Sequence, residues 1–296
     1  MHCKLKPQLG EPAEMKSYKT ILAVARDPRM AAALFGQSFE LASRWDAHVT
    51  GIYAAAPIAV HPALRGRQLD EWMESRLREQ AATAGRVQEA FHKAARAAGA
   101  GSAEWRSEEP AQVPDTSRPL EFARRADLVM VCRSPGDSDF MDPDLIVEDL
   151  LMGSGRPLLV LPRADARTML GQRIAIAWNG SREAARAVHD AMPLLITAPA
   201  GSVQIICPGE KAGSKTLPLG AELAESLSRH GVSAEVSGLD NRHLNAGPDV
   251  LARAAELGAD LLVMGAWGHS RLREFVLGGA TDTALRDSNI PVFMSH

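Results

Sequence analysis

The chain has 296 residues, of which 46% are hydrophobic and 23% charged, with a formal net charge of -3 and a pI near 6.3. This length suits two domains of about 150 residues, each large enough to bury a core without disulfides or metals. The slightly acidic balance and the 5% share of aromatic residues argue against a nucleic-acid binder, which usually carries a basic face and stacking rings.

The first 17 residues are polar and lack the apolar core of a signal peptide, so residues 1–17 are expected to form a disordered lead-in. No apolar run approaches the length of a membrane span. The three cysteines are odd in number, widely spaced and without a C-x-x-C pair, which argues against a disulfide framework or a zinc site. These features together predict a cytoplasmic protein without a membrane segment, a disulfide framework or a structural zinc site.

Short apolar runs alternate with longer amphipathic segments over residues 18–162, a pattern that predicts parallel strands joined by helices. The expected strands lie near 19–26, 48–55, 103–108, 127–133 and 157–162, and the expected helices near 29–46, 69–98, 119–125 and 143–152.

The same pattern repeats over residues 173–296, after a polar linker at 163–172. An Ala-Asp pair precedes a buried strand in both copies, at Asp127 and at Asp260. The second copy is expected to have strands near 173–178, 202–207, 232–237, 260–265 and 290–295, and helices near 181–197, 219–230, 247–257 and 279–288. The fold class is therefore α/β, with two tandem doubly wound, five-stranded parallel-sheet domains of Rossmann-like type.

A glycine-rich motif follows the fourth strand of the second copy. Three glycines, Gly265, Gly268 and Gly278, have the spacing Gly-x2-Gly-x9-Gly and lead into a helix. Glycine lets backbone N–H groups approach an anion, and a helix N-terminus favours phosphate. Arg271 adds positive charge, and His269 is either a phosphate contact or a solvent-facing residue. The motif predicts an anion-binding loop; turn glycines without a ligand are the alternative.

This loop, the strand ending Trp178-Asn179-Gly180-Ser181 and the internal repeat together resemble a tandem member of the universal stress protein family, over nearly the whole chain after the lead-in. The resemblance implies a fold like that of the adenine nucleotide alpha hydrolases, and an ATP site held by a G-x2-G-x9-G-(S/T) motif. Gly279 stands at the Ser/Thr position, and Asn179 stands where the family has an acidic residue that meets the nucleoside. Both departures weaken the expected site without changing the fold.

The resemblance implies that the second copy binds ATP or another adenine nucleotide, with or without Mg²⁺, and that backbone groups at the end of its second strand border the adenine. The expected nucleotide-binding residues are Asn179, Gly180, Ser181, Ile206, Cys207, Met264, Gly265, Gly268, His269, Arg271, Gly278, Gly279, Ala280 and Thr281. No catalytic residue and no protein metal ligand is expected among them.

The first copy is expected to have lost the site. It keeps an acidic residue, Asp27, after its first strand, but only Gly136 remains of the glycine pattern, and the stretch that follows is acidic. Gly153 and Gly155 are interpreted as the end of a helix. Only one nucleotide site, in the second copy, is therefore expected.

Three functions remain open. The first is a nucleotide-binding protein of stress response or signalling, acting on an unknown protein partner; the second is a slow ATP hydrolase, with at most weak ATPase activity; the third is an interaction protein that binds no nucleotide. A homodimer, or a pseudo-dimer of the two copies within one chain, is the expected assembly.

Overall fold

A computed structural model describes residues 17–55, 65–107, 117–133, 145–162, 169–208, 218–239, 246–267 and 279–296. Almost all of the expected lead-in and most of the expected linker therefore lie outside the described residues. Among the described helices, none combines the length and the apolar character that crossing a bilayer requires.

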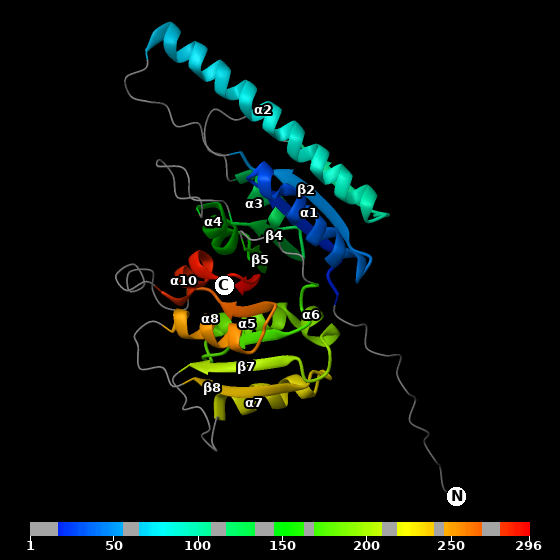
Figure 1. The fold of residues 1–296 in the computed structure, drawn as a ribbon, viewed down its shortest axis with the longest axis vertical. Coiled ribbons are helices and arrows are strands. Elements are labelled where there is room, and N and C mark those ends of the chain that lie inside the picture. The colour runs from blue at the N-terminus through cyan, green and yellow to red at the C-terminus, as the bar shows by residue number, and fades with distance from the viewer. Residues whose placement is uncertain are drawn as a thin grey trace, which may run out of the picture.

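The first half of the chain alternates strands and helices as expected. Its elements are β1 (Thr20–Ala25), α1 (Pro28–Ser43), β2 (His48–Tyr53), α2 (Gly66–Ala97), β3 (Ala103–Arg106), α3 (Ser117–Ala123), β4 (Leu128–Cys132), α4 (Leu145–Gly153) and β5 (Leu158–Leu161). Helix α2 is the longest of these and extends beyond the rest of the first half (Figure 1).

The second half repeats this order from the end of the linker. Its described elements are β6 (Ile174–Ala177), α5 (Arg182–Asp190), α6 (Met192–Thr197), β7 (Val203–Pro208), α7 (Pro218–Ser228), β8 (Ala234–Leu239), α8 (Gly247–Glu256), β9 (Leu261–Gly265), α10 (Ala280–Asp287) and β10 (Val292–Ser295).

Two expected elements differ from those observed. The single helix expected at 181–197 is two helices, because Pro193 in the first turn of α6 cannot donate the backbone hydrogen bond that would continue α5. The strand expected at 232–237 begins at Ala234, because the N–H of Val232 still bonds to the Leu227 carbonyl in the turn that ends α7.

Within the described residues, ten strands form one sheet in the order β3-β2-β1-β4-β5-β10-β9-β6-β7-β8. Each half is parallel and doubly wound, as predicted. The halves are not separate sheets, however, because β5 and β10 pair antiparallel, with Phe293 opposite Leu159. The strands of the two halves therefore run in opposite directions. The carboxyl ends of the strands in one half lie on the same side as the amino ends of the strands in the other half.

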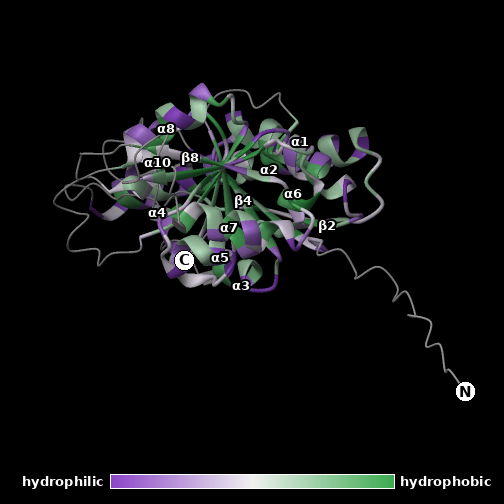
Figure 2. Ribbon diagram, turned by 90° about the horizontal axis from the view of Figure 1, so that it is seen from below, coloured by the Kyte–Doolittle hydropathy of each residue, from purple (hydrophilic) through white to green (hydrophobic). Residues whose placement is uncertain are grey.

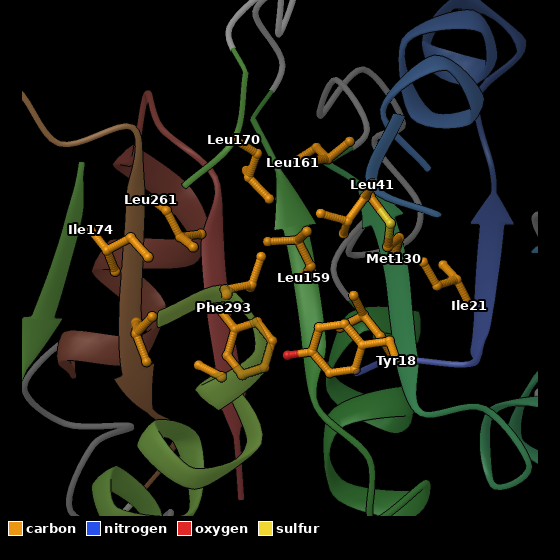
Figure 3. Close-up of a cluster of buried hydrophobic side chains, with 14 of the residues drawn as sticks. Tyr18, Ile21, Leu41, Met130, Leu159, Leu161, Leu170, Ile174, Leu261 and Phe293 are labelled. Atoms are coloured by element: carbon orange, nitrogen blue, oxygen red, sulfur yellow. The ribbon is translucent and has the colours of Figure 1, made fainter. Parts of the chain in front are cut away.

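The helices cover both faces of this sheet. Buried side chains of α1, α2, α5, α6 and α7 share one core, and those of α3, α4, α8 and α10 share the other. Figure 2 shows the apolar strands fanning out between the two layers of helices. The first core is continuous across the junction of the halves, where Figure 3 shows Tyr18, Leu159 and Phe293 within one cluster.

The repeated Ala-Asp pair has the same structural role in both halves. One carboxylate oxygen of Asp127 accepts hydrogen bonds from the backbone N–H groups of Lys19 and Thr20, at 2.8 and 3.0 Å. The Asp260 carboxylate accepts from the N–H groups of Gly171 and Gln172, at 2.9 and 2.8 Å. Each aspartate thus fixes the chain just before the first strand of its half against the start of the fourth.

Candidate functional site

The candidate site lies at the carboxyl ends of β6 and β9. The strand order reverses between these two neighbours, and open α/β sheets bind their ligands at such a point. Ala177 is paired with Met264, and the Trp178 N–H donates to the Ile206 carbonyl at 2.8 Å. The ends of β6, β7 and β9, all of which carry predicted site residues, therefore lie side by side.

The turn from β6 into α5 is built by three of the predicted residues. The Asn179 side-chain oxygen accepts from the Ser181 N–H at 3.0 Å, and Gly180 has a φ of 73° that favours glycine. The Ser181 hydroxyl oxygen then caps α5 by accepting from the Ala184 N–H at 3.2 Å. Asn179 and Ser181 thus hold the turn with their own side chains.

Glu183 adds negative charge at the same turn. Its side chain is only 5% exposed, although it pairs with the largely exposed Arg182. Burial raises the pKa of the Glu183 carboxyl, but hydrogen bonds from Arg182, from its own backbone and from Ser181 outweigh burial and leave the pKa below its usual range. A charged carboxylate therefore offsets the positive end of the α5 dipole.

Gly265 lets β9 end directly against the start of α5. A Cβ added to Gly265 would lie 2.4 Å from the Ala184 nitrogen and 2.5 Å from the Glu183 carbonyl carbon. Both neighbours are backbone atoms that cannot rotate away. This first glycine of the predicted motif therefore has a packing requirement of its own, whatever the loop binds.

The far end of the glycine motif returns to the end of β9. Trp267 has a φ of 45°, which is rare for a bulky residue, and its N–H donates to the Thr281 hydroxyl oxygen at 3.0 Å. Helix α10 begins after Gly279, which supplies no side-chain cap. Gly279, Ala280 and Thr281 thus lie beside the end of β9. Gly268, His269, Arg271 and Gly278 lie outside the described residues.

Thr281 itself is 2% exposed, so its hydroxyl is turned inward to the Trp267 amide. Ile206 and Cys207 point to opposite faces of the sheet: Ile206 packs in the core that contains Met264 and Ala266, and Cys207 packs in the other. The Cys207 sulfur would lie 2.8 Å from a Cβ added to Gly220 of α7. Of the two side chains, only that of Ile206 shares a face with Met264 and α10.

Sequence reasoning did not single out Trp178, Glu183 or Trp267 as site residues. The Trp178 indole N–H donates to the Leu219 carbonyl at 3.1 Å, in the first turn of α7. Trp178 and Trp267 could have been noticed as bulky aromatic residues placed directly after apolar strands. Glu183 carries no such signal, because an acidic residue in a first helical turn is ordinary.

The corresponding edge of the first half is built differently. Asp27 caps α1 and pairs with Arg29, which holds the pKa of its carboxyl below the usual value despite the opposing effect of burial. Cys132 stands where the second half has Gly265, since each ends the fourth strand of its half and pairs with the last. The next residue, Arg133, is 6% exposed and contacts the second half.

Two cavities lie elsewhere, at the amino ends of the strands. One of about 510 Å³ is lined by residues including Arg173, Ser202 and Gln204, and one of about 200 Å³ by residues including Thr20, His48 and Arg106. Neither is lined by any predicted site residue.

Comparison with known proteins gives a family for the second half. Residues 171–296 match the model of the universal stress protein family. No curated protein shows a significant match to the sequence.

Solved structures resemble the chain over both halves. A universal stress protein from Archaeoglobus fulgidus DSM 4304 is 18% identical, with a TM-score of 0.65 over 95% of this chain and 97% of its own. A functionally unknown protein from Pseudomonas aeruginosa PAO1 is 14% identical, with a TM-score of 0.54 over 95% of this chain and 93% of its own. At these identities the similarity shows the fold alone, over 95% of this chain.

Proposed function

We propose that the second half of this chain, a domain of the universal stress protein family, binds an adenine nucleotide at the carboxyl ends of β6 and β9. One observation carries the proposal. The hydrogen bond from the Trp267 N–H to Thr281 Oγ1 holds the start of α10 beside the end of β9, and the N-cap residue of that helix, Gly279, supplies no side-chain cap. Uncapped N–H groups beside a glycine-containing strand end are suited to a phosphate.

In its lack of a side-chain cap, α10 differs from α5, the helix that directly follows β6. Both helices carry an acidic residue in the first turn, Glu183 in α5 and Asp282 in α10. The α5 amides are also capped by Ser181, whereas Gly279 leaves those of α10 to a ligand. The phosphates are therefore assigned to α10.

The nucleoside is assigned to the ends of β6 and β7. The side chains of Ile206 and Met264 are buried on the α10 face of the sheet, so their backbone groups would border the base. Asn179, one residue beyond the backbone bond between Trp178 and Ile206, supplies an amide that can hydrogen-bond a base or a ribose. Nucleotide occupancy would then alter conformation or partner choice in a stress or signalling response.

Calorimetric titration of ATP, ADP and AMP, each with and without Mg²⁺, tests the proposal on three forms of the full chain. In Gly279→Asp, a carboxylate caps α10 and repels phosphate, so nucleotide binding is lost while thermal stability holds or rises. In Gly279→Ser, the added hydroxyl is neutral and can donate to a phosphate oxygen, so nucleotide binding is kept. The φ of -62° at Gly279 permits both side chains. Equal affinities in the three proteins would refute this placement.

A second candidate, an interaction protein that binds no nucleotide, is favoured by one observation. The side-chain oxygens of Asn179 and Thr281 already accept hydrogen bonds from the protein's own backbone. The same titration separates the candidates, because this alternative predicts no heat of binding at millimolar nucleotide in any of the three proteins.

A further inference from the structure

We infer that Arg133, in the first half, is a positioning residue for α10 and so for the nucleotide site of the second half. The functional part of this inference rests on the proposed nucleotide binding; the structural part does not. It makes the site of one half dependent on a residue of the other.

Arg133 is anchored in the first half. It directly follows β4, and its N–H donates to the Leu161 carbonyl at 3.1 Å, which fixes its backbone against β5. The side chain crosses the junction and donates to the Ser288 carbonyl at 3.1 Å through Nη1 and to the Arg286 carbonyl through Nη2.

The two acceptors lie at the end of α10, where helix carbonyls lack partners within the helix. A guanidinium presents two donors in a rigid fork and places a positive charge at the negative end of the helix dipole. The contact is nearly closed to solvent, because Arg133 is 6% exposed, so water screens it little. Arg133 therefore holds α10 by charge and by geometry together.

The same short helix carries the site at its other end. Helix α10 has eight residues, which is about 12 Å of helix, and its first turn bonds to the Trp267 N–H through Thr281. Its middle packs closely on α8, since a Cβ added to Gly247 would lie 2.7 Å from the Thr283 Cβ. A shift at the Arg133 end is therefore carried to Thr281 and Trp267.

The second half has no counterpart of Arg133 at the corresponding position. The residue of the second half that corresponds to Arg133 is Ala266, which follows β9 and whose N–H donates to the Ser295 carbonyl. The carbonyl of Gly155, just beyond α4, is instead contacted by Arg186 of α5, through Nη2 at 2.9 Å. Arg186 is a matched control, because it makes an inter-half contact and its hydrogen bonds go to Gly155 and Asp190, outside α10.

The test uses the full chain labelled with 5-fluorotryptophan. The chain has five tryptophans, and each gives its own fluorine resonance. Trp267→Phe identifies the resonance of Trp267. In Arg133→Met, the Trp267 resonance shifts and nucleotide affinity falls about tenfold. Arg133→Lys keeps the charge without the fork and gives intermediate values. Arg186→Met and Arg286→Met, the latter removing a charge from the same end of α10, leave the Trp267 resonance in place.

An unchanged Trp267 resonance in Arg133→Met would overturn the inference, even if that variant is less stable. Failure of Arg133→Met to fold leaves the decision to Arg133→Lys, for which an unshifted resonance has the same meaning. Absence of nucleotide binding by the unmodified chain would refute the proposed function alone, because the fluorine spectrum of Trp267 still tests the positioning role.

Discussion

The backbone N–H of Trp267 donates a 3.0 Å hydrogen bond to the hydroxyl oxygen of Thr281, fourteen residues further along the chain. This bond joins the two described ends of the glycine motif. It also supports a left-handed backbone at Trp267, a conformation that a bulky side chain disfavours. The hydroxyl of Thr281, one of the expected nucleotide-binding residues, thus has a structural partner.

Replacement of Thr281 tests this bond. Thr281→Val removes the hydroxyl oxygen that accepts from the Trp267 N–H. Because Thr281 is only 2% exposed, water has little access to replace that acceptor. We expect a loss of about 1–3 kcal/mol in the free energy of unfolding, measured by urea denaturation. Thr281→Ser keeps the hydroxyl and should retain most of that stability; similar losses in both variants would assign the effect to packing of the methyl group.

Gly265→Ala should destabilise the chain for a steric reason. The new Cβ would lie 2.4 Å from the Ala184 nitrogen, so β9 and α5 must separate. We expect a cost of about 1–3 kcal/mol. Gly36→Ala is the control, because Gly36 lies inside α1 and, apart from the adjacent residues and the backbone of α1 itself, no atom lies within 4 Å of the new methyl group. That change should stabilise the chain by about 0.5–1 kcal/mol. Two changes of the same sign would contradict the steric account.

The Cys132 thiol should make stability fall at alkaline pH. Burial, with a smaller contribution from the Asp27 charge, raises the pKa of Cys132 from 9.0 to about 12. The unfolded chain therefore releases the thiol proton at a lower pH than the folded chain does. The stabilisation is complete below pH 9.0 and is lost as pH rises toward about 12, by about 1.4 kcal/mol for each pH unit.

Cys132→Val supplies the comparison, since it fills the site without a titrating group. Urea unfolding of both proteins across this pH range should give a shallower decline for the variant. Burial also raises the pKa of Tyr18, so some alkaline decline remains in both. Parallel curves would show that the Cys132 thiol is not the group responsible.

Asp127 and Asp260, which precede the fourth strands of the two halves, should contribute similar amounts to the free energy of unfolding. Asp260→Ala leaves the N–H groups of Gly171 and Gln172 without their acceptor, and Asp127→Ala does the same to Lys19 and Thr20. We expect each change to cost about 1.5–3 kcal/mol, as for hydrogen bonds to a charged group. Chemical denaturation of each single variant measures this. A change below about 0.5 kcal/mol in either would show that water replaces that aspartate.

Much of the fold follows from local pattern. Buried strands such as β4 and β9 are short apolar runs, and Asp127 and Asp260 mark their starts in both halves. Crossover handedness then fixes the order of strands within each half. The break between α5 and α6 was missed although Pro193 is visible in the sequence, because the apolar spacing continues through it.

The site was predictable only in part, because a motif names residues without saying what occupies their hydrogen-bonding groups. Asn179 and Ser181 proved to hold a turn, and Thr281 proved to bind the chain. Each of these roles depends on a neighbour fixed by folding.

By itself the sequence determined the repeat, the parallel α/β class and the glycine spacing, since these depend on periodicity and on backbone freedom at single positions. Only the tertiary structure decided that β5 and β10 join the halves antiparallel, and that this brings Arg133 to the end of α10. The physical reason is that such contacts depend on which edges and helix ends meet in space, and residues 153 positions apart carry no local signal of meeting.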